Sequence, residues 1–471
     1  MSPLGPIRPR RGALGVSVIG TALSGVEAAQ VGMDTVAENL ANAQTAGYVR
    51  QSAQLAALPG GNNAVGSGVA VSAVTVETNQ VLNTLSQATS AQAGAASSEA
   101  QALSAAQSLF NEPTSSGLQS QLSAFWSDWT AVANNPGSLA ARSTLLGAAN
   151  QVVDTFHSLA SGLVSVTQGT QAGLGQLVGQ VNAQLSQMAA LNKAVVAGSG
   201  AEAGQNGLVE QQSSLAASLA SEIGATTTTS ATGAVNVRVG GFLLVQATTA
   251  SILSVTGTGP ATSIGVSGTG APLPLTSGQA AGMMVALSSD LPSWSTSLST
   301  VAGDFASAVN GQLAQGVSWN PLGSATATSA VGTPMFTSSG TGPVTASTIE
   351  VAPAMAAAPA TIAAGSSVAA GPLDGSNAQT LASLSGLAGG PDSLYRALVG
   401  QVGSAVAAAT AAQTQTSQAA SQAASQASAT EGVDTNTQLT KMVGYQQMYE
   451  AAGKVIGTAA TMFSSLLAAI P

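Results

Sequence analysis

The chain has 471 residues, of which only 6% are charged and 3% are aromatic, and its formal net charge is −9. This length leaves room for roughly two to four domains. The acidic balance argues against a nucleic-acid-binding protein, which needs a basic surface. The absence of cysteine excludes disulfides, thiol catalysis and zinc–thiolate sites. So few aromatic residues favour long, thin helical packing and small β modules over large, dense cores.

The first 15 residues are rich in proline and glycine, and we expect them to form a disordered extension. Arg8, Arg10 and Arg11 precede an apolar run and so imitate a secretory signal peptide. However, glycine and serine interrupt this run, and its helical pattern continues through Glu27, which favours an uncleaved helix. We find no apolar window long and clean enough to span a membrane, so no membrane insertion is expected.

The residues that follow predict a long N-terminal helix with one apolar stripe. Apolar side chains recur at alternating spacings of four and three, the pattern of a coiled-coil seam. The members of this stripe are Ile19, Leu23, Val26, Met33 and Leu40. Because asparagine and glycine are typical of helix ends and turns, we expect the helix to stop near residue 42 and an extended arm to follow.

The middle of the chain predicts a helical bundle that a β-rich segment interrupts. Helical signatures at 82–109, 118–129, 139–156, 174–196 and 208–223 predict long antiparallel helices. From residue 224 to about 275, apolar and polar residues alternate around glycine-rich turns, which predicts β-hairpins. Helical spacing returns at 287–309 and again after residue 393, and a strand is expected at 345–351 within an Ala-, Gly-, Ser- and Thr-rich region.

The C-terminal residues from 432 on predict a second long helix with a matching seam. Its large seam residues are Leu439, Met442, Tyr449, Ile456, Phe463, Leu467 and Ile470. Burying five such side chains yields about 8 to 15 kcal/mol, which is less than the cost of ordering the backbone. We therefore expect this helix to fray when alone. Two matched seams predict a chain that folds back on itself; the alternative is two ordinary amphipathic helices on one globular core.

Together these patterns predict an α+β fold that is mainly α, with long terminal coiled-coil helices, a long helical bundle and a β-rich insertion in mid-sequence. The expected segments are a disordered extension (1–15), an N-terminal assembly helix with an extended arm (16–98), a helical bundle (99–223), a β-rich domain (224–280), a helix that returns to the bundle (281–315), a low-complexity outer region (316–392), and C-terminal helices that complete the bundle and the assembly domain (393–471).

We predict no catalytic, cofactor-binding or metal site. His157 is the only histidine, and a base or a metal ligand would need further convergent groups. The glycine-rich stretch 257–270 lacks the lysine of a phosphate-binding loop, so β-turns are expected there. Asp34 and Glu38 lie one helical turn apart, and we interpret them as a solvated helix flank. An enzyme is therefore not expected.

The two ends carry a family resemblance. Residues 22–51 (ALSGVEAAQVGMDTVAENLANAQTAGYVRQ) resemble the N-terminal signature of bacterial flagellar rod, hook and hook-associated proteins, and residues 445–467 are similar to its C-terminal counterpart. Within this family, the helical stretch 118–163 and the segment 219–241 favour the hook-associated proteins of the hook–filament junction. Residues 257–391 depart from the family pattern. The N-terminal motif residues are Asn39, Asn42, Gly47, Tyr48, Arg50 and Gln51, with Val49 in place of the usual serine.

The resemblance implies a structural protein that is exported unfolded and assembles as a ring between hook and filament through its terminal helices. The seam residues would form the assembly interface. The implied partners are further copies of the chain, the hook protein, the next junction protein (hook-associated protein 3) and a flagellar export chaperone. The implied location is the extracellular flagellum, after a cytoplasmic stage. A hook or distal rod protein is the alternative within the family, and a secreted adhesin that binds through residues 224–275 is the alternative outside it.

Overall fold

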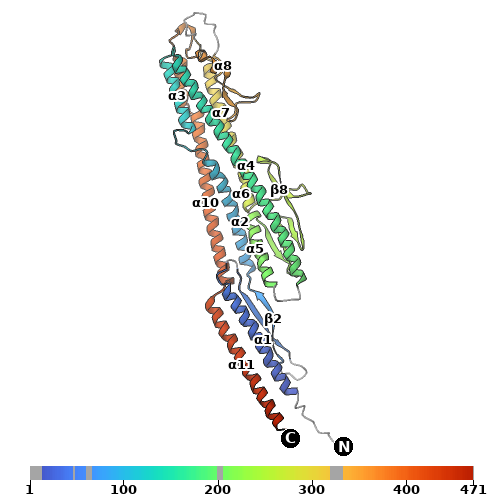
Figure 1. The fold of residues 1–471 in the computed structure, drawn as a ribbon. Coiled ribbons are helices and arrows are strands. Elements are labelled where there is room, and N and C mark those ends of the chain that lie inside the picture. Colours follow the sequence, from blue (N-terminus) through green and yellow to red (C-terminus); the bar gives the residue numbers. More distant parts are fainter. Residues whose placement is uncertain (1–12, 46–47, 60–65, 199–204, 319–331, 470–471) are drawn as a thin grey trace.

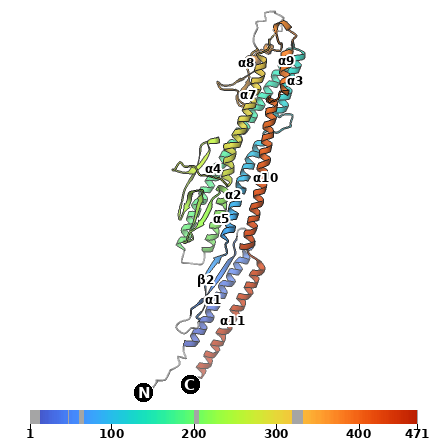
Figure 2. The same ribbon diagram turned by 180° about the vertical axis from the view of Figure 1, so that it is seen from behind.

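The computed structural model describes residues 13–45, 48–59, 66–198, 205–318 and 332–469. These residues form an elongated molecule, with a short helical module at one end of a long helical shaft (Figures 1 and 2). Helices dominate and the sheets are small, so the expected fold class is confirmed. Helix α1 begins and helix α11 ends at the same extremity of the molecule, which means that the chain folds back on itself as predicted (Figure 1).

The terminal module consists of α1 (Ala13–Ala41), a hairpin of β1 (Gln51–Leu58) and β2 (Gly68–Val76), and α11 (Thr435–Ala468). The side chain of Asp434 accepts a hydrogen bond from the backbone N–H of Thr437 at 2.6 Å and so caps the start of α11. Because α1 already begins at residue 13, the expected extension is wrong for residues 13–15, and its remainder lies outside the described residues.

The shaft is built from long helices that run beside one another. These are α2 (Gln80–Gln107), α3 (Leu118–Asn134), α4 (Leu139–Ala197), α5 (Gln205–Ile223), α6 (Gln279–Val285), α7 (Leu291–Leu313) and α10 (Pro391–Glu431). The helical signatures at 139–156 and 174–196 belong to one continuous helix, α4. The expected boundary between residues 98 and 99 falls inside α2, so the shaft begins at Gln80 instead.

The few aromatic residues are concentrated in the outer half of the shaft. Phe305 of α7 lies at their centre, with ring centroids 5.2 Å from Phe125 and 4.8 Å from Phe336. Trp126 and Trp129 are buried in the same cluster, so they belong to the core of the bundle. Aromatic side chains bury a large apolar area each, and gathering them here gives this end of the shaft a dense core in an otherwise aromatic-poor chain.

The β-rich insertion packs on α4 and forms a second core with it (Figure 1). Strands β3 (Thr226–Thr229), β4 (Val235–Val239), β5 (Phe242–Gln246) and β6 (Thr249–Ala250) form an antiparallel sheet, and β7 (Leu253–Thr256) pairs with β8 (Ser263–Val266). In the outer region, β9 (Phe336–Ser338) pairs with β10 (Ile349–Val351), so only the end of the strand expected at 345–351 forms. The short helices α8 (Pro353–Ala357) and α9 (Ser376–Ser383) complete this region.

The turn between β5 and β6 contains a strained backbone position. Among the described non-glycine residues, Ala247 is the one with a left-handed conformation, at φ 50°. Its N–H donates to Asn236 Oδ1 at 2.9 Å, and its carbonyl oxygen accepts from Asn192 Nδ2 at 2.6 Å. These two bonds hold the backbone in a conformation that costs an alanine about 1 kcal/mol or more.

We therefore expect the Ala247→Gly variant to be more stable than the native chain, by up to about 1 kcal/mol, because glycine adopts this conformation without strain. Thermal unfolding followed by circular dichroism would measure the change. The matched variant Ala250→Gly in strand β6 should lose stability instead, since glycine weakens a strand. A loss at both positions would refute the assignment of strain to Ala247.

Candidate assembly interface

Small residues line the contact between α1 and α11. A Cβ atom added at Gly25 would lie 3.5 Å from Cβ of Ala452, and one added at Gly32 would lie 2.4 Å from Cε1 of Tyr445. The buried residues Ala22, Ala29 and Val36 alternate with Gly25 and Gly32 at spacings of three and four and so share this face of α1. Because the interaxial distance depends on the side chains at the contact, these small residues let the two helices approach closely.

The β1–β2 hairpin covers a second face of α1. Oγ of Ser24 accepts a hydrogen bond from the backbone N–H of Val69 at 3.2 Å. Gly68, at φ +116°, lies so close to Ser24 that an added Cβ would be 2.1 Å from its Oγ. Helix α1 is therefore held by α11 on one side and by the hairpin on another.

Most of the predicted seam residues lie outside these contacts. Ile19, Leu23, Leu439, Tyr449, Phe463 and Leu467 are exposed, while Val26, Met33, Leu40, Met442 and Ile456 are half-buried. Ile470 lies outside the described residues. The two seams therefore pair only in part: five of their eleven described members are half-buried, and small residues occupy the closest contacts. The expected fraying concerns the helix when alone and stays a prediction, because in this structure α11 packs against α1.

Large apolar side chains remain uncovered toward the free end of the helix pair. We call the following exposed residues the terminal apolar surface: Val18, Ile19 and Leu23 of α1, and Val455, Met462, Phe463, Leu466 and Leu467 of α11. Phe463 is 59% exposed and Leu467 is 56% exposed. Single exposed apolar residues are ordinary, whereas contiguous exposed apolar patches mark protein–protein or membrane contacts.

The motif residues of the N-terminal resemblance meet where the terminal module joins the shaft. Asn39 is fully buried, and its Nδ2 donates to the Gln51 carbonyl oxygen at 2.8 Å and to Gln438 Oε1 at 3.2 Å. Its Oδ1 accepts from the Gln51 N–H at 2.8 Å and from the Tyr48 hydroxyl at 3.0 Å. One side chain thus connects α1, β1 and α11.

We call the cluster around Asn39 the joint between the terminal module and the shaft. Further hydrogen bonds connect it to the shaft. The backbone N–H of Arg50 donates to the carbonyl oxygen of Glu431 at 2.9 Å, and the Glu431 carboxylate accepts from the backbone N–H of Asn79. Nδ2 of Asn206 in α5 donates to Gln51 Oε1 at 2.8 Å. Sequence reasoning missed Gln438, Glu431 and Asn206, because an isolated polar residue in a helix gives no sign of a distant hydrogen-bond partner.

The remaining motif residues have local roles or are outside the described part of the chain. Asn42 follows the end of α1, and its Nδ2 donates to the carbonyl oxygen of Glu38 at 3.1 Å. Gly47 lies outside the described residues. Burial raises the pKa of Tyr48 to about 12, and the nearby carboxylates of Glu38 and Glu210 add to this shift. The Tyr48 hydroxyl therefore stays protonated at neutral pH and keeps its hydrogen bond to Asn39.

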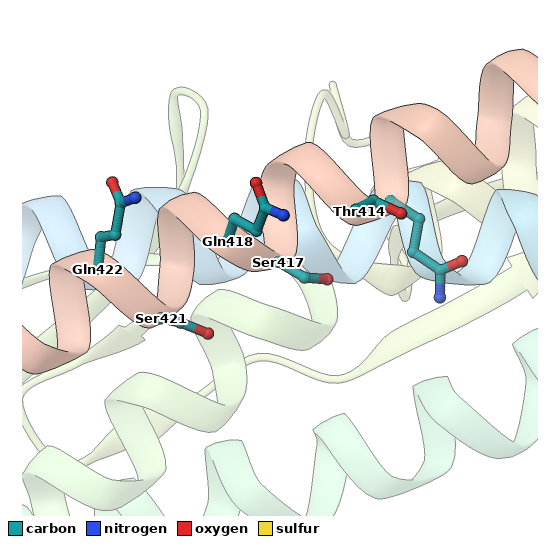
Figure 3. Close-up of a pocket in the computed structure, with 6 residues that line it drawn as sticks. Thr414, Ser417, Gln418, Ser421 and Gln422 are labelled. Atoms are coloured by element: carbon teal, nitrogen blue, oxygen red, sulfur yellow. The ribbon is translucent and has the colours of Figure 1, made fainter.

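The described residues show no arrangement suited to metal binding or acid–base catalysis. No group of three or more His, Cys, Asp or Glu side chains among them could hold a metal ion. Nε2 of His157 lies 2.8 Å from the backbone oxygen of Ile349, so its role is to contact strand β10. A shallow hollow beside α10 is lined by serine, threonine and glutamine (Figure 3), which supply no titratable group.

One helical stretch of the described residues meets a membrane-span criterion by length and composition. It lies within residues 376–468 and contains an 18-residue window with a mean hydropathy of 1.2. This corrects the expectation that no window is apolar enough. The window is only 6% buried, and the α11 part of the stretch contains polar residues among its apolar ones.

Comparison with known proteins gives matches along most of this architecture. The family model described as the helical domain of flagellar hook-associated protein FlgK matches residues 103–336. The model of the flagellar basal body rod FlgEFG protein C-terminal region matches residues 424–469, and that of the flagella basal body rod protein matches residues 19–48. The two rod-protein matches therefore fall on α11 and α1, and the helical-domain match falls on the shaft.

Curated relatives agree with these matches. The flagellar hook-associated protein 1 of Escherichia coli K12 is 29% identical over 244 residues, which are 50% of this chain and 44% of the relative. That of Bacillus subtilis 168 is 32% identical over 213 residues, 43% of this chain and 42% of the relative. The flagellar hook junction protein FlgK from Burkholderia pseudomallei has 24% identity and a TM-score of 0.47, over 54% of this chain and 46% of that chain. The matched region spans less than half the length of these relatives.

The paired terminal helices carry the signatures of the flagellar rod, hook and hook-associated proteins. The match to the helical domain distinguishes the chain within this class. The predicted resemblance to flagellar hook-associated protein 1 is confirmed by these matches.

Proposed function

We propose that this chain is a structural subunit of the bacterial flagellum that joins the hook to the filament and assembles as a ring of copies through α1 and α11. The observation that carries this proposal is the terminal apolar surface, which the single chain leaves uncovered at the free end of its helix pair. Burying one such side chain against a neighbouring copy contributes about 1.5 to 3 kcal/mol, so a few of them supply a useful driving force.

The match to the helical domain over residues 103–336 favours a junction protein over a hook or rod protein. We further propose that the chain is exported unfolded, with an export chaperone covering α11 before assembly. Its partners would be the hook protein on one side and hook-associated protein 3 on the other. The assembled protein would then be extracellular, at the hook–filament junction.

We propose a division of the chain into a terminal module for assembly, a helical shaft, a β-rich insertion and an outer region. Of the predicted interface residues, the exposed ones (Ile19, Leu23, Leu439, Tyr449, Phe463 and Leu467) would contact neighbouring copies directly. The motif residues around Asn39 would instead orient the terminal module on the shaft. The proposed role is structural and requires no enzymatic activity.

We expect a double variant, Phe463→Asp with Leu467→Asp, to fold but to fail in joining filaments to hooks. Two carboxylates on this surface would have to be desolvated at an interface that offers them no partner. The test is motility of a strain that lacks its own junction protein and expresses the variant. The control is Gln447→Asp, an exposed position on α11 outside the predicted seam, which should swim normally. Normal swimming by the double variant would refute the proposed interface.

A further inference from the structure

A buried carboxyl group lies between α4 and α5, away from the assembly interface. Glu222, in the last turn of α5, is 6% exposed. Nε2 of Gln180 donates to its Oε1 at 2.7 Å, and Nε2 of Gln184 donates to the same oxygen at 2.9 Å. The other carboxyl oxygen, Oε2, is buried without a hydrogen-bond partner, and so is Oε1 of Gln184.

The two atoms without partners are both acceptors when Glu222 is ionised, and a buried polar atom without a partner costs about 1 to 3 kcal/mol. A proton on Oε2 would give both atoms a hydrogen-bonding role, because a carboxylic acid can donate from Oε2 while it accepts at Oε1. Gln184 already donates to Oε1 of Glu222 at 2.9 Å, and its own side-chain oxygen is buried without a partner, so that oxygen is available to accept a hydrogen bond from the protonated Oε2. The carboxylate form leaves both of these oxygens, Oε2 of Glu222 and Oε1 of Gln184, without a donor.

No positive charge compensates an ionised Glu222. The elements packed against α5 are α2, α4, α6 and strands β2, β3 and β4. The charged or titratable side chains on these elements are Glu99, Arg142, Asp154, His157, Lys193 and Arg238. The pKa of Glu222 is raised by burial, against which its two glutamine hydrogen bonds act, and none of these charged groups contributes.

We propose that the Glu222 carboxyl is protonated in the folded shaft at neutral pH. Its ionisation would weaken the packing of α5 on α4, so that this packing depends on pH. The opposite end of α5 carries Asn206, which binds the hairpin of the terminal module through Gln51. A change in how α5 packs is therefore transmitted to the joint between the shaft and the terminal module. This inference does not depend on the proposed flagellar role.

Because burial raises the pKa of Glu222, the stability that this group contributes should fall as the pH rises. A carboxyl group whose pKa is higher in the folded than in the unfolded chain contributes stability that is fully present below the ordinary pKa of glutamate. This contribution is lost as the pH rises through the raised value. Glutamine at position 222 keeps the acceptor and supplies a donor in place of the acid proton, and it cannot ionise.

The first test compares thermal unfolding of the native chain and the Glu222→Gln variant between pH 4 and pH 9. We expect equal midpoints near pH 4 and a native midpoint at least about 2 °C below that of the variant near pH 8. Amide exchange in α5 should accelerate over the same range in the native chain only. The control is Glu450→Gln, which removes one charge at an exposed position and should leave the profile parallel to that of the native chain. Parallel profiles for Glu222→Gln would overturn the proposal.

A second test uses the native chain, so that it does not depend on how a variant folds. Carbon-13 NMR of glutamate-labelled protein, with the Glu222 signal assigned by its loss in Glu222→Gln, reports the protonation state directly. We expect the chemical shift of a neutral carboxyl at pH 7. The chemical shift of a carboxylate at that pH would overturn the proposal.

Discussion

Replacing Arg142 by methionine is expected to destabilise the shaft by about 3 kcal/mol or more and to release the outer region. Arg142, in the first turns of α4, is 5% exposed. Its Nε and Nη2 donate to the carbonyl oxygen of Pro136 at 3.0 and 2.9 Å. Nη1 donates to the carbonyl oxygens of Ala360 and Ile362 at 2.9 and 2.6 Å. Methionine fills similar space but would leave these buried acceptors without donors, at about 1 to 3 kcal/mol each.

The side chain of Arg142 therefore attaches the outer region to the start of α4. Burial lowers the pKa of its guanidinium, but an arginine remains charged throughout the physiological range. Lysine should restore this attachment only in part, because one ammonium group cannot reach both the Pro136 carbonyl and the carbonyls of Ala360 and Ile362, which lie at different edges of the planar guanidinium. Chemical denaturation would measure the loss of stability in Arg142→Met, and limited proteolysis should show earlier cleavage within residues 335–390.

The control is Arg396→Met, which changes an exposed arginine on α10. We expect it to change stability by less than about 0.5 kcal/mol. Equal effects at the two positions would contradict this role.

The second large effect is expected at Gly32. A Cβ atom there would lie 2.4 to 2.6 Å from three ring atoms of Tyr445, so Gly32→Ala should force the two helices apart at a cost of about 1 to 3 kcal/mol. The same change at Gly20, where an added Cβ meets nothing within 4 Å, should stabilise α1 by up to about 1 kcal/mol, because alanine is the better helix former. Hydrogen exchange along α11 measures the result.

A compensating variant separates the steric effect from other consequences of the Gly32 substitution. Combining Gly32→Ala with Tyr445→Ser removes the ring that the new methyl group would meet. We expect the pair to recover more stability than the two single changes predict when added, since the two residues are in contact. Strict additivity would show that Gly32 and Tyr445 do not limit the approach of the helices.

The positions of the helices could be predicted from the sequence, because large apolar residues recur with a helical period along them. The hairpin turn at Thr232 and Gly233 was predictable for a similar reason, and Gly233 indeed has φ +80° between β3 and β4. The pairing face of the terminal helices was not predictable in this way. Small residues such as glycine stand out little in an apolar pattern, so the stripe of large residues was taken for the internal contact, although six of its eleven described members are exposed.

The joint could be predicted only in part. The family resemblance singled out Asn39, Tyr48 and Gln51, but nothing in their local sequence indicates which groups they bind. Asn39 and Gln438 are 399 positions apart in the chain, and a single sequence contains no signal that connects them. Buried polar groups need partners, so each such residue predicts that a partner exists without identifying it.

We propose that the terminal helix pair, with its uncovered apolar surface, joins copies of this chain to the hook. Cryo-electron microscopy of isolated hooks mixed with the purified full chain tests it most directly. We expect density for a ring of copies at the distal end of the hook, with residues 455–467 of each copy buried against a neighbour. Copies that stay dispersed, or a ring in which these residues face solvent, would contradict the proposed mode of assembly.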